Sequence, residues 1–321
     1  MPSPHPFKGK IVKRRNLLKR GYWVETAEAY IYILPAFIVL GLFVFYPFIN
    51  AFLLSMHKVY LVKRVGGQLI PFYKVFIGFD NFKLLFRDRF FVKSILVTAT
   101  YVGISVPITL TLALVLATFL DKGFRLKGLY RLSFFLPYIT PVVAISMVWQ
   151  WIFNWRAGLL NYFLSFFGVN LLNWLEDPHL AMPAVIIMNV WRFVGYHSII
   201  LLAGMQGIDK SYYDAAKVDG ASGWRVWRHV TLPLLTPQIF FLLVISLIGS
   251  FKIFEEVFIL FNGTPGPRNS VLTMVYYIFD QGFQRFHFGR AAAASVVLFG
   301  IIFVLTLFQM LVTQRRVHYE Q

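Results

Sequence analysis

Six long apolar stretches determine what this sequence can fold into. They run over residues 29–56, 95–120, 132–155, 180–203, 232–251 and 291–314. A helix needs about 20 apolar residues to cross a hydrocarbon core about 30 Å thick. Hydrophobic residues make up 58% of the chain and charged residues 14%, so a water-soluble domain of 37.2 kDa would lack the polar surface to enclose these stretches. We therefore expect an all-α integral membrane protein with six transmembrane helices.

Lysine and arginine residues predict the orientation, because they accumulate in cytoplasmic segments. With the N-terminus inside, seventeen of them fall in the two tails and two internal loops, and twelve fall outside. This predicts cytoplasmic N- and C-termini and assigns the net charge of +17 to topology rather than to nucleic-acid binding. The predicted segments are a basic cytoplasmic tail (1–28), a first transmembrane helix (29–56), an external loop (57–94), a five-helix core (95–314) with a cytoplasmic loop (204–232), and a cytoplasmic tail (315–321).

The external loop carries eight of the twelve outside basic residues, all between Lys58 and Lys93. We expect a short amphipathic helix around residues 81–90 within it. Its basic side chains are candidates to meet a partner protein.

Several kinds of catalytic and cofactor site are missing from the sequence. It contains no cysteine, which excludes disulfides, thiolate metal sites and a cysteine nucleophile. It has no glycine-rich phosphate loop followed by Lys-Ser or Lys-Thr, so the chain is not expected to bind ATP itself. No histidine pair has metal-ligand spacing. We expect no cofactor and no metal on this chain.

The loop between the fourth and fifth apolar stretches is predicted to fold into two short helices. Ser211 followed by Asp214 resembles a capping box and begins a helix over 212–219. Gly220 ends that helix in a conformation with positive φ. Ser222 is then expected to cap a second helix through residue 229.

The first of these helices has small side chains with charged neighbours. Ala215 and Ala216 allow close approach, and the surrounding charges lie at Asp209, Lys210, Asp214, Lys217 and Asp219. A small centre with a charged rim suits a protein contact. A solvated hairpin that merely joins two spans accounts for the same residues equally well.

A resemblance favours the protein contact. The run 214–220, Asp-Ala-Ala-Lys-Val-Asp-Gly, followed after nine residues by Val-Thr-Leu-Pro at 230–233, resembles the coupling loop of ATP-binding-cassette (ABC) importer permeases, Glu-Ala-Ala-x3-Gly-x9-Ile-x-Leu-Pro. It departs at Asp214 and Val230. Further motifs resemble the carbohydrate-uptake branch, typified by the maltose-type first permease subunit. They lie at 78–82, 134–137, 174–178, 201–206, 251–255 and 263–267.

The resemblance implies a type I importer-like permease subunit for a sugar or oligosaccharide, in the cytoplasmic (inner) membrane of a prokaryote. It also implies a transporter subunit and not an enzyme. Its implied partners are a second homologous permease subunit, two cytoplasmic ABC ATPase subunits that hold ATP and magnesium, an extracytoplasmic solute-binding protein and membrane lipid. The implied ATPase-coupling residues are Tyr212, Asp214, Ala215, Ala216, Lys217, Asp219 and Gly220.

Polar residues inside the spans are candidates for the substrate pathway, because a charge at mid-helix is expensive unless it faces protein or water. Arg192 shares a helix face with Asn189 and Tyr196, which are spaced to hydrogen-bond a hydroxyl-rich or anionic solute. An ion pair of Arg192 with Glu255 or Glu256 across a subunit interface is an equally open interpretation. The candidate pathway residues are Asn189, Arg192, Tyr196, Lys252 and Glu255.

Two other functions compete with sugar import. Arg192 and the basic external loop are consistent with an importer for glycerol-3-phosphate or a related phosphorylated polyol. A membrane-embedded transferase is disfavoured because the adjacent acids at 176–177 and 255–256 point apart and no acid and base meet on one face.

Overall fold

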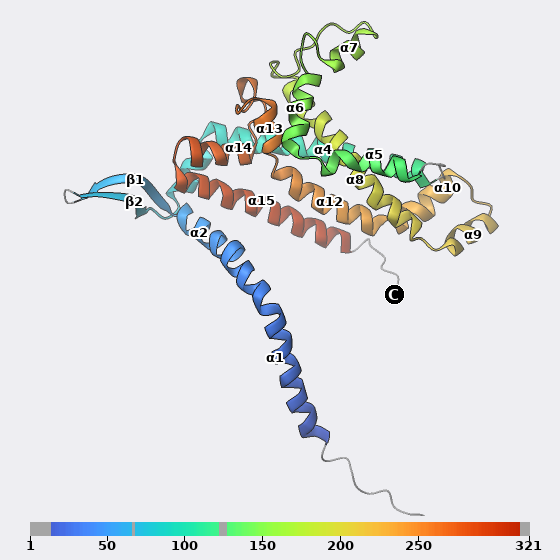
Figure 1. Ribbon diagram of the computed structural model, residues 1–321, viewed down its shortest axis with the longest axis horizontal. Coiled ribbons are helices and arrows are strands. Elements are labelled where there is room, and N and C mark those ends of the chain that lie inside the picture. The colour runs from blue at the N-terminus through green and yellow to red at the C-terminus, as the bar shows by residue number, and fades with distance from the viewer. Residues whose placement is uncertain (1–13, 66–67, 122–126, 315–321) are drawn as a thin grey trace, which may run out of the picture. The chain divides into compact units, whose positions relative to one another are not determined.

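A computed structural model describes residues 14–65, 68–121 and 127–314 (Figure 1). The predicted basic residues in 1–13 and 315–321, together with Lys122 and Arg125 of the first internal loop, lie outside these ranges. The chain divides into two compact units, residues 1–53 and 54–321.

The first unit is helical. It runs through α1 (Arg14–Leu40), the π-helical turn η1 (Gly41–Phe45) and most of α2 (Tyr46–Ser55). The backbone N–H of Tyr46 donates to the carbonyl of Gly41, which closes the wider turn without interrupting the helix. The apolar helix Glu28–Ser55 is 28 residues long and contains an 18-residue stretch of mean hydropathy 2.3, and it differs from the predicted first span by one residue at each end.

The second unit begins with two strands that the sequence analysis did not anticipate. β1 (His57–Val65) and β2 (Gln68–Phe76) pair antiparallel, with His57 opposite Phe76 and Lys58 opposite Val75. Both runs are rich in β-branched and aromatic residues, and Gly-Gly separates them in the sequence, which is a hairpin signal. The fold is otherwise helical, as expected.

The helix predicted around residues 81–90 is present with different ends. α3 (Asp80–Arg87) stops at Asp88, whose extended backbone separates it from α4 (Arg89–Asp121). The buried side chain of Asn81 donates to the backbone carbonyls of Ser55 and His57, at 2.7 and 3.0 Å. α3 is thereby fixed to the start of the hairpin.

Within the described residues, the six predicted spans correspond to four unbroken helices and two bent pairs. The unbroken windows are Glu28–Ser55, Arg89–Asp121, Ala181–Gln206 and Phe288–Val312. The predicted span 132–155 is bent by 104° between α5 (Lys127–Ile139) and α6 (Val142–Ile152), where Pro141 adopts ψ 133°. A proline with extended backbone cannot continue the preceding helix, which explains the break.

The fifth predicted span is likewise bent, by 62°, around Leu235. Pro233 and Pro237 flank this position, and neither can donate a backbone hydrogen bond. The elements on its two sides are α10 (Trp224–Val226), the π-helical η2 (Trp227–Thr231) and α11 (Leu232–Leu234), then α12 (Thr236–Phe251).

The remaining elements complete the second unit. They are α7 (Leu159–Ser165), α8 (Ala181–Gln206), α9 (Lys210–Val218), α13 (Glu255–Leu260), the 3-10 turn η3 (Pro267–Asn269), α14 (Met274–Phe279), the π-helical η4 (Asp280–Gln284) and α15 (Phe288–Gln314). Figure 1 shows α4, α8, α12 and α15 side by side, with the hairpin and α14 at one end and α9 and α10 at the other.

Small residues allow the long helices to approach closely. Ala113 and Ala117 of α4 are fully buried in a cluster with Leu201 and Leu202 of α8. A Cβ on Gly195 of α8 would collide with the backbone carbonyl of Phe134 in α5. Without a strong hydrophobic drive between helices in lipid, such close backbone contact is a main source of packing energy.

Candidate functional site

A cavity of about 550 Å³ lies among α4, α5, α8, α12 and α13. Four of the predicted pathway residues line it: Asn189, Tyr196, Lys252 and Glu255. Asn189 is buried and donates to the carbonyl of Val185 at 3.1 Å. The predicted helix face of α8 is therefore brought together with the end of α12.

Arg192 is placed differently from the expectation. It does not line the cavity, and its Nη1 instead donates to Glu256 Oε1 at 2.8 Å. The two side chains are 15% and 12% exposed. The predicted pairing of Arg192 with one of the two adjacent acids is confirmed, and the acid is Glu256. Its expected place across a subunit interface is wrong, because the pair forms within one chain.

Aromatic and hydroxyl side chains that the sequence analysis missed form much of the cavity wall. Tyr138 stacks on Tyr196, with ring centroids 4.0 Å apart and an interplanar angle of 7°. Further polar lining comes from Tyr101, Ser105, Thr109, His197, Ser246 and Ser250. The three on α4, Tyr101, Ser105 and Thr109, recur every four residues along one face of the helix, which is a polar stripe that periodicity could have identified.

The second candidate site is α9, at the end of the bundle opposite the hairpin (Figure 1). The predicted helix exists, but it begins earlier than expected. Asp209 is its N-cap and accepts the backbone N–H of Ser211 at 2.7 Å, so the predicted capping box beginning at Ser211 is wrong. This hydrogen bond lowers the pKa of Asp209. The charged cap is therefore retained at neutral pH and lost as the pH falls below that pKa.

The end of α9 follows the expectation. Gly220 has φ +73°, which an L side chain rarely adopts. The exposed side chains of Lys217 and Asp214 form an i, i+3 ion pair at 2.9 Å. Tyr212, Ala215 and Asp219 are exposed, whereas Ala216 is half-buried. The predicted coupling residues thus lie on one compact element, most of them open to a partner.

The segment after α9 departs from its prediction. Ser222 caps no helix: α10 begins at Trp224, and its N-cap is Gly223 without a side-chain hydrogen bond. The chain then continues through η2, a π-helical segment of the kind often found at functional positions. Trp227 in η2 donates from Nε1 to Thr118 Oγ1 of α4 at 3.1 Å, which joins the loop to a helix that lines the cavity.

Metal ligation finds no support in the described part of the chain. No group of three or more histidine, aspartate or glutamate side chains lies close enough to hold a metal ion there.

Comparisons with known proteins agree with this architecture. Residues 109–318 match the family model described as the binding-protein-dependent transport system inner membrane component. Over 306 residues the chain is 33% identical to the lactose transport system permease protein of Rhizobium radiobacter, covering 94% of this chain and 98% of that protein. It is 35% identical over 245 residues to the sn-glycerol-3-phosphate transport system permease protein of Agrobacterium fabrum, covering 76% and 83%.

A solved structure extends the likeness to the fold. A chain of a bacterial ABC transporter involved in the import of the acidic polysaccharide alginate superposes with a TM-score of 0.77 and 25% identity, covering 94% of this chain and 99% of that chain. The family match spans well over half of the sequence, including the cavity helices α8 and α12 and the α9 loop. The chain belongs to the inner membrane component family of binding-protein-dependent transport systems.

Proposed function

We propose that this chain forms part of the path by which an ATP-driven importer moves a sugar or oligosaccharide across the inner membrane. The main support is the nearly full-length similarity to a lactose transport permease. As a permease subunit of an ABC importer, the chain works with a second permease, ATPase subunits and a solute-binding protein. ATP and magnesium would be held by the ATPases, since this sequence has no phosphate loop.

The helix α9 would receive the movement of the ATPase. Its alanines allow close contact, and its charged rim sets the register of that contact. The hydrogen bond from Trp227 to Thr118 gives this movement a direct route into α4. Rigid-body rocking of the spans would then open the cavity alternately to the two sides.

The cavity chemistry favours a neutral solute. Its charged wall residues are Lys252, Glu255 and Glu256, and the guanidinium of Arg192 already pairs with Glu256. With Glu256 neutralised by Arg192, the wall keeps one carboxylate, Glu255, and one ammonium group, Lys252, and so has no net positive charge to hold an anionic solute. The hydroxyl and amide groups of the wall suit hydrogen bonding to sugar hydroxyls, and the stacked pair of Tyr138 and Tyr196 offers an aromatic surface.

Glycerol-3-phosphate is the second candidate solute, because a relative at 35% identity transports it by name. For that solute the Arg192–Glu256 pair would have to open so that the guanidinium could reach the phosphate. Such an opening leaves Glu256 partly buried without its counter-ion, which is costly.

The proposed function is tested by reconstituting the chain in vesicles with its second permease, ATPases and solute-binding protein. Sugar-loaded binding protein should stimulate ATP hydrolysis and sugar import. Ala215→Leu places a bulky side chain on the exposed face of α9 and should lower stimulated hydrolysis at least about tenfold, equivalent to about 1.4 kcal/mol. Ala215→Ser is the matched control that keeps the small size.

Three results would count against this function. They are stimulation by glycerol-3-phosphate but by no neutral sugar, normal stimulated turnover in Ala215→Leu, and group-transfer activity of the purified chain without its ATPase partners.

A further inference from the structure

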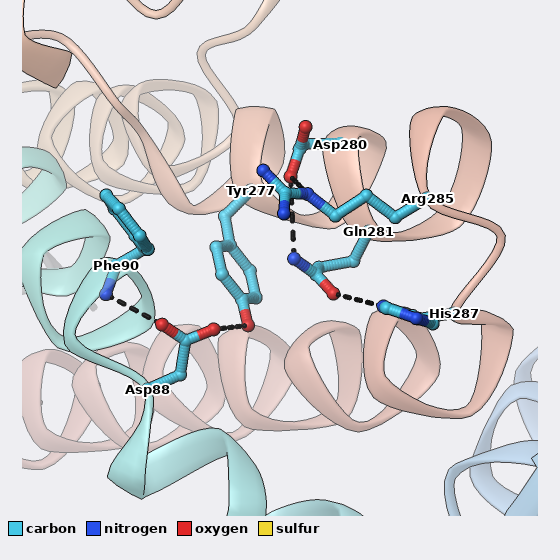
Figure 2. A network of polar contacts seen from close by, with 7 residues as sticks. All are labelled: Asp88, Phe90, Tyr277, Asp280, Gln281, Arg285 and His287. Carbon is cyan, nitrogen blue, oxygen red and sulfur yellow. Dashed lines mark hydrogen bonds and ion pairs between the residues drawn. The ribbon is translucent and has the colours of Figure 1, made fainter.

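A second, polar pocket of about 310 Å³ lies at the opposite end of the bundle from α9. Its walls come from the start of α4, the end of α14, η4 and the start of α15 (Figure 2). Most of its polar residues precede the spans Arg89–Asp121 and Phe288–Val312 in sequence. The pocket is separate from the α4–α8–α12 cavity, with which it shares no lining residue.

The two acids of the pocket already have donors within the chain. Asp88 accepts the backbone N–H of Phe90 at 2.9 Å on one oxygen and the hydroxyl of Tyr277 at 2.8 Å on the other. Asp280 accepts Arg285 Nε at 2.6 Å. Figure 2 shows Asp88 held by Phe90 and Tyr277, and Asp280 held separately by Arg285 and Gln281.

The buried amide of Gln281 positions His287 in the wall of the pocket. Gln281 is 4% exposed, and its Oε1 lies 3.1 Å from His287 Nδ1 (Figure 2). Because an amide oxygen only accepts, His287 donates from Nδ1. Burial, together with Arg290 and Arg285, lowers the pKa of His287, so the imidazole is neutral at pH 7. His287 therefore adds no further positive charge to the pocket wall.

Arg290 is the cation that this network leaves without an acid. It is half-buried in the first turn of α15 and lines the pocket. Among the described residues it forms no ion pair within 4.0 Å, whereas Arg285 is paired with Asp280. A partly desolvated guanidinium that has no acidic partner among the residues the structure describes is suited to a carboxylate that arrives from outside.

The surrounding sequence adds positive charge. The segment from Lys58 to Lys93, which leads into the pocket, has eight basic residues and only Asp80 and Asp88 as acids. Such a field steers an acidic partner toward the pocket. With the cytoplasmic assignment of α9, this end of the bundle faces the compartment of the solute-binding protein.

We propose that the pocket around Arg290 is a docking socket for an acidic side chain of the solute-binding protein. This rests on the proposed function, which supplies that partner. The incoming carboxylate pairs with the free donors of Arg290, and the surrounding basic residues accelerate the encounter. Docking at this site is therefore electrostatic and weakens as salt increases.

The socket is tested in the reconstituted importer by measuring ATP hydrolysis against the concentration of its sugar-loaded binding protein. Arg290→Gln should raise the half-saturating concentration about tenfold and flatten its salt dependence, while the maximal rate stays the same. Arg290→Lys keeps the charge but loses the planar fork, so its effect should be intermediate.

Lys83→Gln is the matched control. Lys83 is an exposed cation on neighbouring α3, 70% exposed and paired with Asp80, and it does not line the pocket. Its loss should shift the half-saturating concentration less than about twofold, as for a rim charge. An equal shift in Lys83→Gln would mean diffuse attraction and would overturn the socket.

A crosslink provides a readout that does not depend on folding of the Arg290 variants. The sequence has no cysteine, so Gln284→Cys, on the exposed part of η4, creates a single attachment point. A short photoreactive group there should capture the binding protein, and the captured amount should fall as the salt concentration rises. Capture of lipid alone would overturn the proposal.

Three further results distinguish failure of the proposed socket from failure of the proposed function. If no binding protein stimulates hydrolysis at all, the proposed function fails. If stimulation is normal but Arg290→Gln leaves the half-saturating concentration unchanged, only the socket fails. If the Arg290→Gln effect disappears in vesicles of phosphatidylcholine without anionic lipid, the occupant is a lipid headgroup and the protein socket is wrong.

Discussion

At the scale of single residues, the pair of Arg192 and Glu256 determines how the cavity treats charge. Removing one partner leaves a partly buried charge without compensation, which typically costs about 3–5 kcal/mol. Arg192→Gln or Glu256→Gln alone should therefore lower the melting temperature of the purified chain. The double variant should recover most of the loss, because both charges disappear together.

Transport distinguishes a structural pair from a solute contact. If Arg192 only neutralises Glu256, the double variant should import neutral sugar at a rate close to that of the unchanged chain. Recovery of the melting temperature without recovery of sugar import would mean that the guanidinium contacts the solute. Lys252→Gln, on the exposed side of the cavity wall, provides a comparison in which no observed ion pair is broken.

The same pair shows where sequence reasoning stops. An arginine at mid-span requires a partner, and the sequence offered Glu255 and Glu256 as acids. Neighbouring residues on a helix point in directions about 100° apart, so only the position of α13 against α8 selects Glu256. The N-cap of α9 is similar, since Asp209 and Ser211 are both good caps and the backbone geometry decides between them.

At the scale of elements, apolar length predicted the positions of the spans but not their continuity. The third span is bent where Pro141 takes an extended backbone with ψ 133°, whereas Pro107 lies within the continuous helix α4. The sequence analysis did not predict the β1–β2 hairpin because it assigned the basic external segment to a loop. The β-branched and aromatic residues of this segment and its Gly-Gly pair nevertheless indicate a hairpin. The helix α9 was predicted with its end correct because Gly220 stops it, whereas its start was misplaced because the cap is Asp209 rather than Ser211.

The contact between η2 and α4 leads to a prediction about coupling. Trp227→Phe removes the donor to Thr118 but keeps the ring, at a cost of about 1 kcal/mol for one hydrogen bond. We expect less sugar imported per ATP hydrolysed, with basal hydrolysis unchanged, because α4 would follow the loop less closely. Thr118→Val should have the same effect, and the double variant should add little to either.

Matched controls isolate this hydrogen bond. Thr118→Ser keeps the hydroxyl that accepts from Trp227 and donates to the Leu114 carbonyl. Trp224→Phe keeps an aromatic ring stacked on Trp227, 4.6 Å between centroids, without touching the bond to Thr118. Strictly additive effects of Trp227→Phe and Thr118→Val would show that the contact does not transmit the movement.

At the scale of the whole molecule, transport requires the two ends of the bundle to face different compartments. α9 would meet the ATPase at one end, and η4 lies at the other, next to the polar pocket (Figure 1). Val218 is 88% exposed at the end of α9, and Phe283 is 67% exposed in η4. Because the chain has no cysteine, Val218→Cys and Phe283→Cys each introduce a single reactive site.

A membrane-impermeant maleimide should label Phe283→Cys in cells whose inner membrane is intact and whose outer envelope has been opened to the reagent. It should label Val218→Cys only after the inner membrane is permeabilised. In the assembled importer, the ATPase should also protect Val218→Cys from the reagent, because α9 is the surface proposed to contact it. Labelling of both positions from the same side would contradict the orientation derived from the basic residues, and with it the assignments of α9 to the ATPase and of the Arg290 pocket to the solute-binding protein.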